Sequence, residues 1–501
     1  MIEPQRQLDR LTLFAFMWAW AETMQPLNTH AAMTSWAGLL LPLFTIALIL
    51  RPGSTRLLIA FLIASLSRTM VIMPFVPNHI LFMALVNLTL LTAIVQQALR
   101  QRSWQVDRKA VYECFSVVAR WQLVLLYLFA ALAKLNWDYL NPEVSSATAL
   151  FDGVTSIFAW LPQNHLTEQT AIYGSIALEI VIPVLLLFRR TRLAGIGCAV
   201  AFHMVLSIHP LWATSILTFT MMIFAMLVLF ASDRMLDWFF QRIGQSQRLA
   251  KAWLVLAYLV TVTAVLVTVF PRSIDHSFDK IRMCHTIAFV PHFVSCVVLS
   301  GLAAYYCGLR SRTIVGSATS NRRPTPVFGV NVCWLVLVLT FFNGCCPYAG
   351  LKTTTAFTMF SNLRTEGQLD NHLFLPDGDW FEYQRHLVRV LDSDDPLLAP
   401  YVETGDMITL FELRRICARD YESPPNRTYT LNHDVRHHMF ARPRRPAGNH
   451  YVRYRLNGRE YSACRNQDNK HCLFRKLPWY REKFLAFRPV CAPGQPAPCD
   501  H

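Results

Sequence analysis

Two ionisable side chains occur inside or at the edge of apolar segments, where a charged group could take part in chemistry. Lys134 follows an uninterrupted apolar run, 123–133, in the stretch FAALAKLNWDYLNP. His203 lies within a second apolar segment, 193–209. A lysine in a desolvated pocket has a lowered pKa and can act as a base. A lysine at the edge of an apolar run can equally be an interfacial anchor, and spacing alone leaves both interpretations open.

A few other charges occur within apolar segments, where an ionisable residue is a functional hypothesis by default. Glu22 and Arg68 are the right types for a structural ion pair between two segments. Arg120 is close enough to the start of its segment to extend its guanidinium to the interface. Glu179 needs a proton or a cationic partner, so a structural pair with an arginine and a catalytic role are both open.

The composition predicts the elements that must position these residues. The chain is 53% hydrophobic and only 16% charged, whereas soluble globular proteins carry about 25% charged residues. Apolar stretches recur at lengths near the roughly 18 residues that suggest a membrane-spanning helix. We therefore predict an all-α polytopic membrane bundle of about eleven spans. The predicted spans are 11–27, 34–50, 56–75, 79–99, 113–134, 169–188, 193–209, 212–231, 252–270, 285–308 and 326–344.

Loop charge predicts the orientation of these spans. If the N-terminus is cytoplasmic, the cytoplasmic loops carry most of the lysines and arginines, and the opposite loops carry only Arg272, Lys280 and Arg282. This asymmetry accounts for much of the net charge of +15 without a nucleic-acid partner, and it makes membrane lipids the expected surroundings. An odd number of spans places the C-terminal region outside the cytoplasm, in a periplasm, at a cell surface or in the ER lumen.

The same pattern predicts two domains, a helical membrane domain at 1–344 and an extracytoplasmic domain at 345–501. The second contains short strand-like pieces, TAFTMFSNL, NHLFLP, MITLFEL and NHYVRYRLNG, separated by turn residues. We therefore expect it to be mainly β. Within the first domain, ALFDGVTSIFAWLP lies in a long loop and is expected to form an interfacial helix.

Four cysteines in the C-terminal tail suggest covalent cross-links. Both neighbouring spacings are C-x7-C, and an even number of cysteines in an oxidising compartment indicates two disulfides. A zinc site is the alternative, but its usual spacing is C-x2-C, so no metal is predicted. The cysteines are Cys464, Cys472, Cys491 and Cys499.

Helix direction brings the first two residues to the same side of the membrane. The span ending at Lys134 runs outward, and so does the span that contains His203. At 1.5 Å per residue, His203 lies roughly one to two turns below Pro210 at the outer boundary. Both residues are therefore expected near the extracytoplasmic face.

A resemblance to a known family also singles out the stretches that contain Lys134 and His203. The stretch YLFAALAKLNWDYLNPEVSSA resembles the motif around the active-site lysine of vitamin K-dependent γ-glutamyl carboxylases and of the related bacterial horizontally transferred transmembrane (HTTM) domain proteins. FHMVLS, residues 202–207, is similar to the Phe-His-x-x-Asn-Ser stretch of that family. AFTMFSNLRTEGQLDNHLFLP stands where the carboxylases begin their luminal β-rich domain. The resemblance covers residues 8–232 and, more loosely, 345–380.

The resemblance implies a concrete chemistry. In the carboxylases a lysine deprotonates reduced vitamin K, oxygen adds, and the strong base that results removes a γ-proton from a substrate glutamate, which then takes up carbon dioxide. Carried over, Lys134 is the base and His203 lines the quinone pocket or orients the reacting groups. Trp137 and Tyr139, together with Phe202, would contact a flat naphthoquinone. The cofactor would be reduced vitamin K or a related quinol, and the substrate a peptide or protein that contains glutamate.

Two departures from the family leave other functions open. Leu206 replaces the family asparagine, and no match to the propeptide-binding region is found. The alternatives are a non-catalytic or transport membrane protein that reuses the bundle, and a quinone-linked thiol oxidoreductase. The oxidoreductase would need a reactive cysteine pair near the outer face, where only Cys345 and Cys346 occur.

Overall fold

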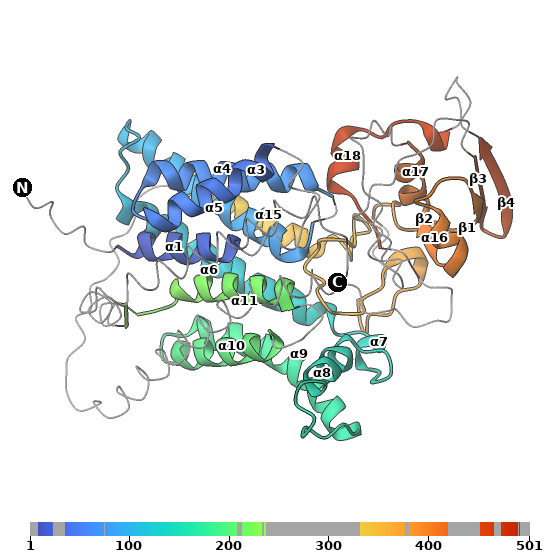
Figure 1. Ribbon diagram of the computed structural model, residues 1–501, viewed down its shortest axis with the longest axis horizontal. Helices are drawn as coiled ribbons and strands as arrows, with labels where there is room; N and C mark the ends of the chain where they lie inside the picture. Colours follow the sequence, from blue (N-terminus) through green and yellow to red (C-terminus); the bar gives the residue numbers. More distant parts are fainter. Residues whose placement is uncertain are drawn as a thin grey trace, which may run out of the picture. The chain divides into compact units, whose positions relative to one another are not determined.

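The computed structural model describes residues 9–23, 36–74, 76–207, 213–232, 235–236, 331–375, 380–418, 451–464, 472–488 and 490. Most of them are helical, and one small antiparallel sheet is present (Figure 1). The chain divides into two compact units. The bundle unit comprises Met1–Val71, Phe82–Tyr127 and Leu178–Thr340, and the sheet unit comprises Ile72–Leu81, Leu128–Ala177 and Phe341–His501.

Helices are found in every predicted span that falls wholly or partly within the described residues. They are α1 (Arg10–Glu22), α3 (Trp36–Leu50), α4 (Thr55–Ile72), α5 (Asn78–Gln101), α6 (Arg108–Ala133), α9 (His165–Leu187), α10 (Arg192–Leu206), α11 (Ala213–Val228) and α15 (Cys333–Cys345). The predicted spans 252–270 and 285–308 lie outside the described residues.

Four of these helices, α4, α5, α6 and α9, are long and apolar enough to cross a membrane. Shorter apolar helices accompany them at Leu40–Leu50, Arg192–Leu206, Ile216–Val228 and Cys333–Cys345. The chain therefore has the character of a helical membrane protein, and the total of about eleven spans stays a prediction.

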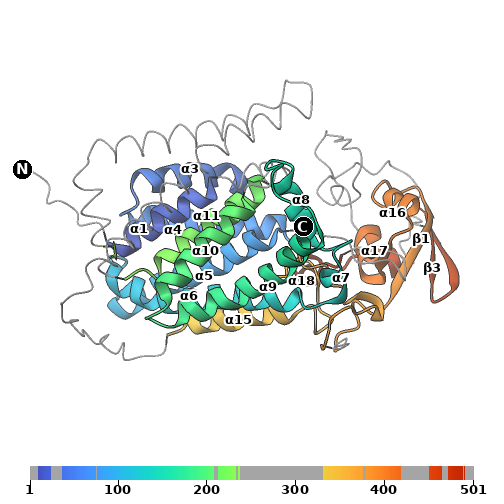
Figure 2. The ribbon, with the colours of Figure 1, turned by 90° about the horizontal axis from the view of Figure 1, so that it is seen from below.

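Within the bundle unit, α1 packs against α3 and α11, and α10 packs against α11 (Figure 2). Buried polar side chains join helices in this apolar interior. Trp18 donates its indole N–H to Asn87 Oδ1 at 2.6 Å, and Asn87 Nδ2 donates to Ser65 Oγ at 2.9 Å. Hydrogen bonds of this kind fix which helix faces meet where apolar contacts alone specify little.

The ion pair predicted between Glu22 and Arg68 is present. Arg68 Nη1 lies 3.0 Å from Glu22 Oε1, and both side chains are buried. The pair joins α1 to α4. Removing one partner of such a pair leaves a buried charge, which is strongly destabilising, so the pair has a sufficient structural explanation.

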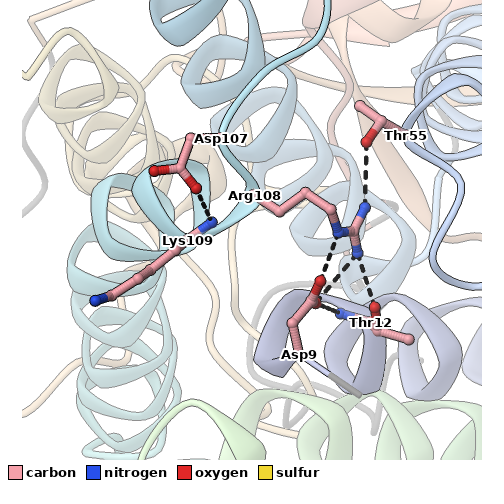
Figure 3. Close-up of polar contacts among 6 residues, drawn as sticks. All are labelled: Asp9, Thr12, Thr55, Asp107, Arg108 and Lys109. Carbon is pink, nitrogen blue, oxygen red and sulfur yellow. Dashed lines mark hydrogen bonds and ion pairs between the residues drawn. The ribbon is translucent and has the colours of Figure 1, made fainter. Parts of the chain in front are cut away.

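Arg108 ties together the starts of three helices (Figure 3). Its guanidinium donates to both carboxylate oxygens of Asp9, at 2.7 and 3.3 Å, and to the hydroxyls of Thr12 at 2.9 Å and Thr55 at 3.2 Å. Asp9 is also the N-cap of α1, because its Oδ1 accepts the Thr12 N–H. The N-termini of α1, α4 and α6 therefore meet at one end of the bundle unit, as alternating helix directions require.

We expect Arg108→Ala to destabilise the bundle unit by about 1–2 kcal/mol, because it removes a forked, charge-assisted set of hydrogen bonds that is only partly exposed. The measurement is the thermal unfolding midpoint of the purified protein in detergent. Lys109→Ala is the matched control, since the exposed Lys109 side chain points away from this cluster (Figure 3). Equal midpoints for the two variants would show that the cluster contributes nothing.

Acid should weaken the same cluster. Burial alone would raise the pKa of the Asp9 carboxyl, but the hydrogen bond and charge of Arg108 and the Thr12 N–H outweigh it and lower the pKa below its ordinary value of 3.8. A carboxyl with a depressed folded-state pKa stabilises the fold above its unfolded-state pKa and loses that contribution as pH falls through the folded-state value. Any contribution of Arg108 to stability should therefore shrink below about pH 4.

The sheet unit contains a four-stranded antiparallel sheet in the order β2-β1-β3-β4. Its strands are β1 (Leu387–Ser393), β2 (Met407–Thr409), β3 (Tyr451–Leu456) and β4 (Arg459–Cys464). Asn457 and Gly458, both at positive φ, form the two-residue turn between β3 and β4, as Asn-Gly turns in hairpins do. The strand expected in NHYVRYRLNG is therefore confirmed.

Helices share the sheet unit with the strands, so the expectation of a mainly β tail at 345–501 is not confirmed for the residues that the structure describes. These helices are α7 (Trp137–Leu140), α8 (Ser146–Thr155), α16 (Ala399–Thr404), α17 (Leu410–Ala418), α18 (Trp479–Phe484) and the 3-10 helices η3 (Glu366–Gln368) and η5 (Cys472–Phe474). In MITLFEL only β2 is extended, and α17 begins at Leu410. Buried Leu413, Ile416 and Cys417 follow at helical spacing.

TAFTMFSNL is irregular rather than a strand. Its hydroxyls bond to nearby carbonyls, Thr355 to Thr354 and Ser361 to Thr358, which gives the backbone an alternative to a sheet ladder. ALFDGVTSIFAWLP is helical in its first part, as α8, and its predicted place at the membrane interface stays a prediction.

The structure does not support the disulfide expected at Cys464. This residue has a free, exposed thiol at the end of β4, where its partner across the ladder is Tyr451. Cys491 and Cys499 lie outside the described residues, as does the side chain of Cys472. A second disulfide among those three positions stays a prediction.

Candidate functional site

Lys134 lies directly after the last residue of α6, in the sheet unit. Its side chain is 5% exposed, and Nζ lies 5.8 Å from the centroid of the Tyr139 ring. A cation over an aromatic face is stabilised by the ring quadrupole, and the carbonyl end of a helix favours positive charge. The site therefore accommodates an ammonium group within the protein interior.

Asn136 builds the turn that presents Lys134. Its Oδ1 accepts the N–H of Tyr139 at 2.8 Å, so it is the N-cap of α7. Its Nδ2 donates to the carbonyls of Ala133 at 2.8 Å and Ser361 at 2.5 Å. The buried amide of Asn136 thus forms hydrogen bonds with the end of α6, with the start of α7 and with a segment more than two hundred residues away in sequence.

A second segment, 361–373, runs beside this turn. Trp137 donates its N–H to the carbonyl of Asn371 at 3.0 Å, and Leu373 donates its N–H to Leu135 at 2.9 Å. Asn371 Nδ2 donates to Asp138 Oδ2 at 2.7 Å. These bonds join two stretches that the family resemblance drew on separately, 127–147 and 356–376.

The backbone just before this segment and at its start is strained. Thr355, Phe357, Phe360 and Asn362 have φ values of 60°, 62°, 48° and 53°, a region that side chains other than glycine enter at a cost of about 1–3 kcal/mol each. Asn362 is held by Ser146, whose N–H and hydroxyl both donate to Asn362 Oδ1. Strain of this kind persists where surrounding contacts fix the geometry, and it concentrates at functional sites.

His372 is held in one tautomer next to the end of α6. Its Nδ1 lies 3.3 and 3.0 Å from the backbone nitrogens of Phe374 and Leu375, which can only donate, so Nδ1 is the acceptor. Nε2 therefore carries the proton and donates to the Leu132 carbonyl at 3.0 Å. Burial lowers the pKa of His372 from its ordinary value of 6.5, although the Leu132 carbonyl and Asp370 oppose the shift.

This arrangement predicts a pH dependence. The unfolded chain protonates His372 as pH falls through about 6.5, while the folded protein keeps it neutral to a lower pH. The contribution of His372 to stability is therefore full above 6.5 and is lost as pH falls toward the folded-state pKa. We expect His372→Gln to reduce the difference between unfolding midpoints measured at pH 7.5 and pH 5. His165→Gln, at an exposed position of the same unit, should leave that difference unchanged, and identical behaviour of the two variants would refute the assignment.

The aromatic residues predicted around the lysine differ in exposure. Tyr139 is 1% exposed, and its hydroxyl lies 2.6 Å from Ser175 Oγ. Trp137 is 67% exposed, so in this structure its ring faces outward rather than forming a closed wall. Tyr139 is thus the aromatic contact of Lys134 that the structure records.

His203 and Phe202 belong to α10 in the bundle unit. The imidazole is 1% exposed, and Nε2 lies 2.7 Å from the hydroxyl of Tyr127 in α6. The rings of Phe202 and Phe219 meet it edge-on at centroid distances of 5.1 Å. Ser207 donates its hydroxyl to the His203 carbonyl at 2.8 Å. The predicted proximity of His203 to Lys134 stays a prediction, because the two residues lie in different units.

The other predicted intramembrane charges are also in the bundle unit. Glu179 is buried in α9. Arg120 donates Nε to the Leu229 carbonyl at 2.7 Å, and its guanidinium lies over the Phe230 ring, as does that of Arg192. Arg120 is therefore tied to the end of α11.

Sequence reasoning missed the amides and histidine that surround Lys134. Asn136 had a usable signal, because an asparagine three residues before Tyr139 has the spacing of a helix cap. Asn362, Asn371 and His372 gave no such signal, since they reach the lysine segment only through the fold. Tyr127 stands two helical turns before Lys134 and also went unnoticed.

The surroundings of Cys345 and Cys346 do not favour the reactive thiol that a thiol oxidoreductase would need. Cys346 donates its thiol to the Phe342 carbonyl at 3.2 Å. Burial raises the pKa of this thiol, against the opposing charge of Lys352, and a raised pKa lowers the fraction of reactive thiolate.

Comparison with known proteins identifies no relative: no protein family, curated protein or solved structure matches this chain.

Proposed function

We propose that the protein is an integral membrane enzyme of the γ-glutamyl carboxylase type, in which Lys134 is a base acting on a reduced quinone. The supporting observation is the burial of Lys134 within the protein. An interfacial anchor lysine keeps its ammonium group in water by extending along the surface, whereas this side chain is 5% exposed.

The residues around Lys134 suit a flat, hydroxylated ring. Lys134 would supply the amine that accepts the proton, and Tyr139 supplies a buried aromatic face. Asn136 bonds to the Ala133 carbonyl before the lysine and Asn371 bonds to the Asp138 side chain after it, so the turn that carries Lys134 is held on both sides. A reduced quinone, when bound, would supply the acidic hydroxyl and the reducing equivalents.

The roles of the remaining residues follow the resemblance. His203 and Phe202 would line the quinone pocket, and Trp137 would contact the ring from its exposed position. The substrate class is a glutamate-containing peptide or protein, and carbon dioxide would be the group added. Arg68, Arg120 and Glu179 are assigned to the structure of the bundle.

The test is an assay of the purified full-length protein in detergent or lipid nanodiscs with a reduced naphthoquinone, oxygen, bicarbonate labelled with carbon-14 and a glutamate-rich peptide. We expect quinol consumption together with label in the peptide. Quinol consumption without label would keep the quinol chemistry and reject carboxylation. A protein that consumes no quinol while folded would overturn the proposal and favour a non-catalytic or transport role.

We also propose that the N-terminus is cytoplasmic and the C-terminal region extracytoplasmic. The charge asymmetry of the loops supports this orientation, and the meeting of the α1, α4 and α6 N-termini around Arg108 supports the alternation of helix directions on which it depends. A reporter fused after His501 should be active in its extracytoplasmic form only. A fusion active in the cytoplasm would reverse the orientation and remove the oxidising compartment that a disulfide among the remaining tail cysteines requires.

A further inference from the structure

Two buried thiols touch each other inside the bundle unit. Cys114 lies in the second turn of α6, and Cys333 is the first residue of α15. Their Sγ atoms are 3.9 Å apart, and both residues are buried. They are 219 residues apart in sequence, so the contact is a product of the fold and not of local spacing.

Polar side chains fix the register between the two helices at this point. Asn331 Nδ2 donates to the Cys114 carbonyl at 3.1 Å, and Asn331 Oδ1 accepts the N–H of Cys333 at 3.1 Å. Gln96 of α5 accepts the N–H of Val332 at 3.0 Å. The start of α15 is therefore bonded to both α5 and α6, and this holds the two sulfur atoms opposite each other.

Each thiol also has an oxygen acceptor. Cys114 Sγ lies 3.0 Å from Asn331 Oδ1, and Cys333 Sγ lies 3.5 Å from the Thr89 carbonyl. Forming a disulfide bond of about 2.05 Å requires the sulfur atoms to approach by roughly 2 Å. Rotation of two side chains on helices already in register can supply that approach.

We propose that Cys114 and Cys333 are a dithiol–disulfide couple that reversibly cross-links α6 to α15, with a lipid-soluble quinone as the oxidant. Two S–H bonds break and one S–S bond forms. The two electrons and two protons released reduce the quinone to the quinol. A thiol reductant in the adjoining aqueous phase restores the dithiol by thiol–disulfide exchange.

The surroundings of the pair favour an oxidant of this class. The thiols are buried in an apolar bundle, which disfavours charged aqueous oxidants. Next to Cys333, α15 carries exposed apolar side chains, Trp334, Leu335, Val338 and Leu339, so a lipid-soluble molecule can approach this helix from the membrane. The inference does not depend on Lys134, because it requires only a two-electron acceptor and no carboxylation.

The test uses the full-length protein in nanodiscs with duroquinone, whose ring is fully substituted and so resists addition of thiols. After treatment, free thiols are alkylated without reduction and the peptides are mapped by mass spectrometry. We expect a linked peptide pair containing Cys114 and Cys333, about one quinol per linked protein, a higher unfolding midpoint, and loss of the link with dithiothreitol. Cys198→Ser, at a free thiol of α10 in the same unit, is the matched control and should keep the link.

Cys114→Ser should abolish both the link and the shift in unfolding midpoint. The reciprocal variant Cys333→Ser gives an independent test if Cys114→Ser fails to fold. Circular dichroism of both variants must show native helix content. The proposal is overturned if both thiols of the folded wild-type protein stay fully alkylatable after duroquinone and after the stronger thiol oxidant diamide. It is also overturned if the link forms only in denatured protein, or if diamide links the pair while duroquinone does not, which would exclude a quinone as oxidant.

Discussion

Lys134→Arg is expected to abolish quinol turnover while leaving expression, membrane insertion and folding unchanged. Arginine keeps the positive charge and the cation–ring contact with Tyr139, but it stays protonated and cannot accept a proton. Positioned acid–base groups typically contribute about 10²–10⁴-fold to rate, so the loss should be at least of that order. The measurement is quinol oxidation per folded protein, with the unfolding midpoint recorded on the same sample.

Two further variants separate the role of the proton from that of size and charge. Lys134→Met keeps an unbranched chain of similar length without a base, and it should be as inactive as Lys134→Arg. Lys109→Arg, at an exposed lysine, should turn over like wild type. If Lys134→Arg matched the wild-type rate, Lys134 would be an interfacial anchor and the carboxylase-type mechanism would be rejected.

Asn136→Ala is expected to destabilise the sheet unit by about 3 kcal/mol or more. The substitution removes the donors to the Ala133 and Ser361 carbonyls and the acceptor for the Tyr139 N–H. Each buried group left without its partner costs about 1–3 kcal/mol. The unfolding midpoint in detergent gives the loss, and hydrogen exchange should show faster opening around α7.

Asn141→Ala is the matched control for this substitution. Asn141 is an exposed asparagine five residues further on, and its side chain accepts the Glu143 N–H. It should shift the midpoint by less than about 0.5 kcal/mol, as surface substitutions usually do. Equal shifts for the two variants would mean that the amide at Asn136 does not hold the two segments together.

The helices could be predicted from sequence because the length of an apolar segment is a local property of the chain. The run 123–133 needs no information from elsewhere to form the end of α6, and the ion pair of Glu22 with Arg68 follows from the cost of isolated charges in an apolar interior. The paired sulfur atoms of Cys114 and Cys333 could not be predicted in this way, because helix register across 219 residues is decided by packing.

The residues that surround Lys134 could not be predicted from sequence for a similar reason. Ser361 and Asn371 reach Asn136 across more than two hundred residues, and no periodic pattern connects them. The segment that carries Ser361 was expected to be a strand because it is a short piece bounded by turn residues. Its hydroxyls bond to its own carbonyls instead, and its positive φ values are incompatible with a regular strand.

A structure of the protein extracted with its native lipids and supplied with a reduced naphthoquinone tests the central claim most directly. Our account predicts flat density for the quinol with one hydroxyl within hydrogen-bonding distance of Lys134 Nζ and the ring against Tyr139. A quinol bound elsewhere, with Lys134 Nζ enclosed by protein atoms alone, would contradict the assignment of Lys134 as the base.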